Sequence, residues 1–135
     1  MPARAITEGL LETRADGTIA LIGGYSPTSA RFHFPMLDAC PSTGATDVER
    51  VILSAEATLW AWTAVTAAPP GYAGPVPFGF GVVEFVREQL RVITRLTEAD
   101  PARLAFGQPM RLVPEVLPLE SGESVTTWAF ESAAT

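Results

Sequence analysis

Lysine is absent from this sequence, and cysteine and histidine occur once each. All nine basic residues are arginines. Without lysine, the chain cannot use a Schiff-base mechanism of its own, nor a phosphate-binding loop of the GxxxxGK type. Cys40 has no second cysteine for an internal disulfide. Any catalytic triad or histidine-rich metal site would depend on His33.

Long hydrophobic runs and net positive charge are also missing. No apolar run approaches the roughly 20 residues that span a membrane, and the N-terminal stretch lacks the continuous apolar core of a signal peptide. We therefore expect a cytoplasmic protein without membrane contact. The formal net charge of −6 disfavours nucleic-acid binding, which depends on neutralising phosphates. With 135 residues, 47% of them hydrophobic, the chain can bury a core of its own.

Short alternating segments rich in β-branched and aromatic residues predict a mainly β protein. We expect strands at 48–54, 58–66, 78–86, 89–97, 110–116 and 124–131. A helix start, Asp100 followed by Pro101, separates the third and fourth of the last five strands. A helix in that position is typical of the five-stranded OB-fold, a Greek-key barrel, and we predict this fold for 48–135.

Two smaller segments precede the predicted barrel. Apolar spacing at Ile6, Leu10 and Leu11, with Thr7 as a possible N-cap, predicts a short helix at about 6–14. An extended piece then ends at Gly23-Gly24. In the next segment, prolines among serines, threonines and glycines predict an irregular conformation. The predicted organisation is therefore 1–24, 25–47 and 48–135.

Several weak motifs follow one another in a specific order over nearly the whole chain. They are EGLL to LIGG within 8–24, SPTSARFHFP and CPSTG within 26–44, PPGY at 69–72, GVVEF at 81–85, RLT to RLV within 95–113, and TWAF at 127–130. In this order and spacing, the chain resembles the OB-fold and zinc-ribbon partner proteins of thiolase-like enzymes, the former domain of unknown function 35 family.

The resemblance places the four zinc-ligand positions of the ribbon at Ser26, Ser29, Cys40 and Thr43. Structural zinc requires four thiolate or imidazole ligands, and Cys40 with His33 supplies at most two. We therefore expect a degenerate, metal-free, rubredoxin-like ribbon and no cofactor bound by this chain. Packing would have to hold such a ribbon together, chiefly through Phe32, Phe34 and Pro35.

The resemblance also implies an accessory role without catalytic residues. Family members pair with thiolase-fold subunits that make or break carbon–carbon bonds in acyl-CoA thioesters. The expected complex contains two thiolase-like subunits and two copies of this chain, and its substrate is a CoA thioester. The small subunit would shape the acyl-CoA channel and stabilise its partner.

Contacts with the partner or ligand are expected in the FHFP phrase and the proline-rich loop, at Phe32, His33, Phe34, Pro70, Gly71, Tyr72 and Phe78. All of these residues have a purely structural alternative. Arg91 and Arg95 share one face of their strand and are either solvated or available to a CoA phosphate.

Other functions stay open at this point. One is a free-standing module that binds acyl-CoA or another small ligand. A second is an OB-fold nucleic-acid binder that stacks bases on Trp60, Trp62 and Trp128. The remaining catalytic interpretation is a Cys40 nucleophile with His33 as its base.

Overall fold

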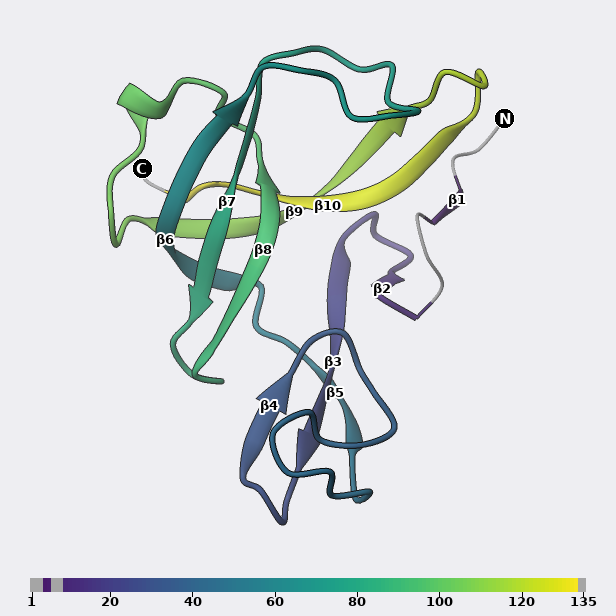
Figure 1. The fold of residues 1–135 in the computed structure, drawn as a ribbon, viewed down its shortest axis with the longest axis vertical. Helices are drawn as coiled ribbons and strands as arrows, with labels where there is room; N and C mark the ends of the chain where they lie inside the picture. The colour runs from purple at the N-terminus through teal and green to yellow at the C-terminus, as the bar shows by residue number, and fades with distance from the viewer. Residues whose placement is uncertain (1–3, 6–8, 134–135) are drawn as a thin grey trace.

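The computed structural model describes residues 4–5 and 9–133, which form two β-sheets (Figure 1). The elements are β1 (Arg4–Ala5), β2 (Leu11–Thr13), β3 (Ile19–Ser26), β4 (Arg31–His33), β5 (Glu49–Ile52), β6 (Glu56–Val65), β7 (Phe78–Phe85), β8 (Leu90–Leu96), the 3₁₀-helix η1 (Pro101–Arg103), β9 (Pro109–Pro118) and β10 (Ser124–Ser132). Among the described residues η1 is the one helical element, so no helix is long or apolar enough to cross a membrane.

Five strands close into the predicted barrel. β6, β7 and β8 form an antiparallel meander, β10 pairs in parallel with the end of β8, and β9 pairs with both β10 and β6. β1 extends the sheet by pairing with β10. η1 lies between the third and fourth barrel strands, and the Asp100 carboxylate caps it by accepting the Ala102 N–H. The mainly β class and the closed five-stranded barrel are confirmed.

The predicted alternation holds in β8 and is interrupted in β6. Val92 and Leu96 of β8 are buried, whereas Ile93 is 63% exposed. In β6, the register with β7 shifts between Leu59 and Ala61. A bulge of this kind adds a residue to one strand and re-aims its neighbours. Trp60 is 40% exposed, whereas Trp62, predicted on the same face, packs against the barrel core.

One hydrophobic core is shared by both sheets. The first half of β3 and the segment after β5 contribute Ile19, Leu21 and Leu53 to the cluster that fills the barrel. Phe85 and Phe130 lie at its centre with no exposed surface. Because β3 continues from this core into the small sheet (Figure 1), the small sheet is attached to the barrel by packing as well as by the chain.

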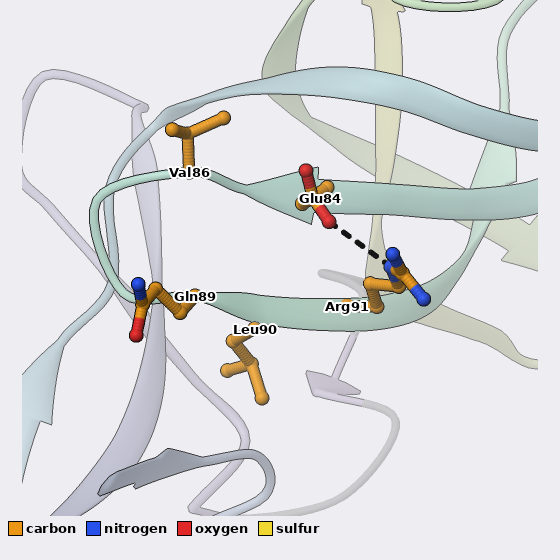
Figure 2. A pocket seen from close by; sticks show the side chains of 5 residues that line it. All are labelled: Glu84, Val86, Gln89, Leu90 and Arg91. Carbon is orange, nitrogen blue, oxygen red and sulfur yellow. Dashed lines mark hydrogen bonds and ion pairs between the residues drawn. The ribbon is translucent and has the colours of Figure 1, made fainter. Parts of the chain in front are cut away.

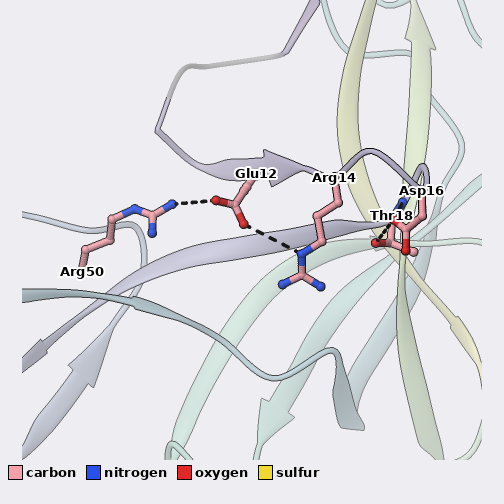
Figure 3. A network of polar contacts seen from close by, with 5 residues as sticks. All are labelled: Glu12, Arg14, Asp16, Thr18 and Arg50. Atoms are coloured by element: carbon pink, nitrogen blue, oxygen red, sulfur yellow. Dashed lines mark hydrogen bonds and ion pairs between the residues drawn. The ribbon is translucent and has the colours of Figure 1, made fainter.

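The predicted N-terminal helix is wrong in the part that the structure describes. Residues 6–8 of the predicted helix lie outside the described residues, and the rest contains β2, a strand that pairs with β3. The connection is a hairpin loop in which Gly17 adopts φ of 87°. Asp16 accepts hydrogen bonds from the amide and hydroxyl of Thr18 (Figure 3). The Asp-Gly pair is a hairpin signal, which the helical spacing of three apolar residues obscured.

The segment 25–47 is largely irregular, as predicted, but it also contains the end of β3 and the short strand β4, which belong to a small antiparallel sheet. β4 and β5 both pair with the second half of β3, so the expected strand at 48–54 joins this sheet (Figure 1). An exposed ion pair from Glu12 to Arg50 connects β2 and β5, and Glu12 also pairs with Arg14 of its own hairpin (Figure 3). Exposed pairs of this kind each contribute less than about 1 kcal/mol.

Candidate functional site

The four former ligand positions converge in the small sheet. Ser26 ends β3 and Ser29 lies in the following turn; Cys40 and Thr43 lie in a second turn, closed by a bond from the Gly44 N–H to the Cys40 carbonyl. Ser26 is fully buried and Cys40 is 3% exposed. We call these four residues together with Asp47 the hydroxyl cluster.

Hydrogen bonds join every member of the hydroxyl cluster. Ser26 Oγ lies 3.2 Å from Ser29 Oγ, and Ser29 Oγ lies 2.5 Å from Thr43 Oγ1. Hydrogen bonds from the hydroxyls of Ser29 and Thr43, and from the Ser42 backbone, lower the pKa of the Cys40 thiol to about 7. Each of the two turns is therefore bonded to the other through side chains.

Asp47 supplies the negative charge of the hydroxyl cluster. Ser26 Oγ donates to its carboxylate at 2.6 Å, and Thr28 donates through both its amide and its hydroxyl. These bonds lower the pKa of Asp47 to about 2. Sequence reasoning missed this residue, because Asp47 lies 21 positions after Ser26 and matches no ligand position.

The donor set does not fit structural zinc. One thiol and three neutral hydroxyls are not the closed set of thiolate and imidazole ligands that such a site needs. The hydroxyls are already engaged with one another and with Asp47. Among the described residues, no group of three or more His, Cys, Asp or Glu side chains is placed to hold a metal ion.

Asp47→Asn is expected to reduce stability near neutral pH and to change its acid dependence. The pKa of Asp47 is lowered from 3.8 to about 2, so its hydrogen bonds stabilise the native state above about pH 4. This stabilisation is lost as the pH falls towards 2. In urea titrations, the stability difference between wild type and variant should shrink over that interval. Asp38→Asn, at an exposed position, is the control; equal losses in both variants would contradict the assignment.

Ser29→Ala is expected to raise the pKa of the Cys40 thiol from about 7 towards 9.0, since the Ser29 hydroxyl is its principal hydrogen-bond donor. Titration of thiolate absorbance reports Cys40 directly, because the chain has no other cysteine. Ser42→Ala is the matched control, as Ser42 acts through its backbone. An unchanged thiol pKa in Ser29→Ala would refute the role of this hydroxyl.

The three predicted residues of the FHFP phrase make different contacts. Phe32 packs on Tyr25 with ring centroids 4.6 Å apart, and Phe34 meets Trp128 of the barrel edge-to-face at 5.5 Å. His33 is buried, and its Nε2 accepts the Leu37 N–H at 3.1 Å. A Cβ at Gly24 would collide with this imidazole ring. His33 and Cys40 thus bond to different groups. The two side chains do not form the nucleophile–base pair that the sequence left open.

A pocket lies between the small sheet and the β7–β8 turn. Its lining includes the predicted residues Phe32, His33 and Phe34, the turn residues Glu88 and Gln89, and Leu90 at the start of β8. The buried Glu88 accepts hydrogen bonds from the amide and hydroxyl of Ser54, at 2.7 and 2.9 Å. This carboxylate thereby holds the turn against the segment joining β5 to β6.

A second pocket adjoins the same turn on its barrel side. Figure 2 shows its lining residues, with the ion pair from Arg91 Nε to Glu84 at 3.0 Å. The Arg91 guanidinium also lies 4.1 Å from the ring centre of Trp60. Two pockets thus flank the β7–β8 turn, and sequence reasoning assigned it no role.

The proline-rich loop at 66–77 is held by Arg95. Its guanidinium lies 4.2 Å from the Phe78 ring centre and 5.3 Å from that of Tyr72, and its Nε donates to Glu115 at 2.6 Å. The Arg95 side chain is 16% exposed. It is therefore neither solvated nor free for a CoA phosphate. We call Arg95, Glu115, Tyr72 and Phe78 the loop anchor.

Backbone bonds complete the attachment of this loop. Ala73 N–H donates to Pro118, and Glu120 N–H donates to Gly71. Of the predicted contact residues here, Pro70 and Gly71 are exposed, whereas Tyr72 and Phe78 are buried. The loop joins β6 to β7 at the barrel end opposite the β7–β8 turn (Figure 1). The structure therefore separates the predicted site residues into two groups.

Together the barrel and the anchored loop define an OB-fold protein, and the small antiparallel sheet of β2 to β5 precedes its barrel. Residues 50–114 match the family model described as the ChsH2 C-terminal OB-fold domain. The family indicated by the sequence motifs is thereby confirmed.

A solved structure shares this fold over most of its length. A chain titled "Ltp2-ChsH2(DUF35) aldolase" superimposes with a TM-score of 0.62 at 21% sequence identity, covering 85% of this chain and 86% of that chain. None of the curated proteins matches the sequence significantly. At this identity the structural likeness establishes a common fold.

Proposed function

We propose that this chain is a non-catalytic subunit of a thiolase- or aldolase-type complex that makes or cleaves carbon–carbon bonds in acyl-CoA thioesters. The observation that carries the proposal is the fold shared, over 85% of the chain, with a chain whose title names the Ltp2-ChsH2 aldolase. The match of residues 50–114 to the ChsH2 C-terminal domain supports it independently. We place the complex in the cytoplasm.

The proposed arrangement has two copies of this chain beside two thiolase-fold subunits, which hold the catalytic residues. The CoA thioester is the substrate of the complex, and this chain carries no cofactor. In this proposal the segments 1–24, 25–47 and 48–135 have different roles. The ribbon segment and the barrel contribute to the acyl-CoA channel, while the N-terminal segment supports their packing.

Two surfaces are the proposed contact sites. In the proline-rich loop, exposed Pro70 and Gly71 make the contact, and buried Tyr72 and Phe78 hold the loop in place. At the other end of the barrel, Phe32 and Phe34 border the pocket with the β7–β8 turn, and His33 supports that wall. Rigid loops on a barrel scaffold are common binding elements.

Capture of the tagged full-length chain from its native lysate tests the proposal. We expect a thiolase-fold protein in near-stoichiometric amount, identified by mass spectrometry. Pro70→Asp should reduce this recovery at least about tenfold, because a charge would be buried at the interface. Phe106→Asp is the matched control, since Phe106 is 70% exposed and lies outside both surfaces.

Other outcomes would favour the alternatives. Recovery of the chain alone, with tight binding of a CoA ester in titration, would replace the subunit proposal by a free-standing ligand-binding module. Salt-sensitive binding of an oligonucleotide would replace it by a nucleic-acid binder.

A further inference from the structure

The hydroxyl cluster has the layout of a metal centre without its ligands. Ser26 and Ser29 are three positions apart around one turn, and Cys40 and Thr43 are three apart around another. Structural zinc sites take two ligands from each of two such turns, with two or more residues between the paired ligands. Here the same four side chains meet through hydrogen bonds.

The distances between the hydroxyl oxygens can be compared with those between the ligand atoms of a zinc centre. The hydroxyl oxygens are 2.5 and 3.2 Å apart along the chain of contacts from Thr43 through Ser29 to Ser26. In a tetrahedral centre with metal–sulfur bonds of about 2.3 Å, the sulfur atoms lie about 3.8 Å apart. The ligand atoms of a zinc centre would therefore lie about one ångström further apart than these oxygens. Part of this difference is made up by the C–S bond, which is longer than the C–O bond.

Asp47 explains how the cluster is stable without a metal. Its carboxylate accepts the Ser26 hydroxyl and two donors from Thr28, so it fixes the turn after β3. Ser29 then connects this turn to Thr43 of the second turn. A buried hydroxyl whose hydrogen bonds are satisfied carries little desolvation cost.

We infer that the hydrogen bonds of the hydroxyl cluster, organised by Asp47, replace a metal ion in joining the two turns, and that the backbone retains the geometry of a four-ligand metal centre. Thiols in place of the Ser26, Ser29 and Thr43 hydroxyls are then sufficient, with Cys40, to create a zinc site. This inference concerns the small sheet and stands independently of the proposed function.

Cobalt titration of the full-length triple variant Ser26→Cys/Ser29→Cys/Thr43→Cys tests the retained geometry. We expect one Co²⁺ per chain with the visible bands of a tetrahedral thiolate centre, displaced by one equivalent of Zn²⁺. Adding Cys40→Ser removes one ligand. Affinity should then fall by more than the about 10- to 100-fold that loss of an outer-shell partner costs. Wild type should show no such bands.

Two results with the triple variant would overturn the inference. One is a folded variant, by circular dichroism, that binds no Co²⁺ in tetrahedral geometry. The other is a variant that stays unfolded with Zn²⁺ present, because the backbone would then not bring four thiols to one ion.

Wild-type protein tests the second half of the inference without any new thiol. A chelator should leave its melting temperature unchanged, whereas Asp47→Ala should lower it and speed proteolysis within 26–47. Asp38→Ala, at an exposed position in the same segment, should do neither. A melting temperature lowered by the chelator, or equal effects of the two aspartate variants, would overturn the inference.

Discussion

Phe130→Ala is expected to lower the free energy of unfolding by about 3–5 kcal/mol. Phe130 has no exposed surface, and its ring meets that of Phe85 at 70° with centroids 5.9 Å apart. It lies in β10, the strand that pairs with both β8 and β9 and so closes the barrel. Truncation would leave a cavity where the two sides of the barrel meet.

Urea denaturation of the full chain measures this loss. Native domains are stable by only about 5–15 kcal/mol, so the variant should unfold at a much lower urea concentration. Phe106→Ala provides a matched control, because this phenylalanine is 70% exposed and should change stability by less than about 0.5 kcal/mol. Similar losses in the two variants would be inconsistent with the barrel core described above.

Arg95→Met is the second large effect that we expect, at about 2–4 kcal/mol. The substitution removes the cation that lies against the Phe78 and Tyr72 rings and leaves the Glu115 carboxylate, 23% exposed, without its partner. Breaking a largely buried pair in this way is costly because one charge stays poorly hydrated. The Tyr72 and Phe78 rings should then lose their contact with β8, although the backbone bonds of the loop to Pro118 and Glu120 persist.

Limited proteolysis within the loop and urea denaturation together measure this effect. Arg91→Met, four residues earlier in the same strand, is the control: its ion pair with Glu84 is about half exposed and should contribute less than about 1 kcal/mol. If the loop is a partner contact as proposed, Arg95→Met should also reduce capture of the thiolase-fold protein. Faster cleavage in the control than in Arg95→Met would disprove the anchoring role.

The barrel was predictable because its information is local. Alternation of apolar and polar residues predicted β8 almost to the residue, and the Asp100-Pro101 pair predicted η1. In contrast, three apolar residues with helical spacing outweighed the Asp-Gly hairpin signal, and β2 was predicted as a helix. Three-residue strands such as β2 and β4 have too few residues to show a period of two, and pairing with β3 determines them.

The grouping of the former zinc-ligand positions was predictable from the sequence, but the surroundings of the other candidate residues were not. Sequence motifs indicated Ser26, Ser29, Cys40 and Thr43 as a set, and the structure brings them together. The two predicted contact regions, in contrast, lie at opposite ends of the barrel. The residues next to Arg95 in the sequence do not show whether its side chain is solvated or lies against the Tyr72 and Phe78 rings, since burial depends on segments that are distant in sequence.

The sequence by itself therefore determined the barrel strands, the capped turn and the loss of zinc ligands, because each depends on residue types within a few positions of one another. It also indicated the family, through the order of short motifs along the chain. Contacts across the fold settled the rest. Asp47 as the anion of the hydroxyl cluster, Glu88 on Ser54 and Arg95 in the loop anchor all pair groups at least 20 positions apart. Such pairs form only when folding brings residues that are distant in sequence together. A local sequence pattern does not show which of these residues will meet.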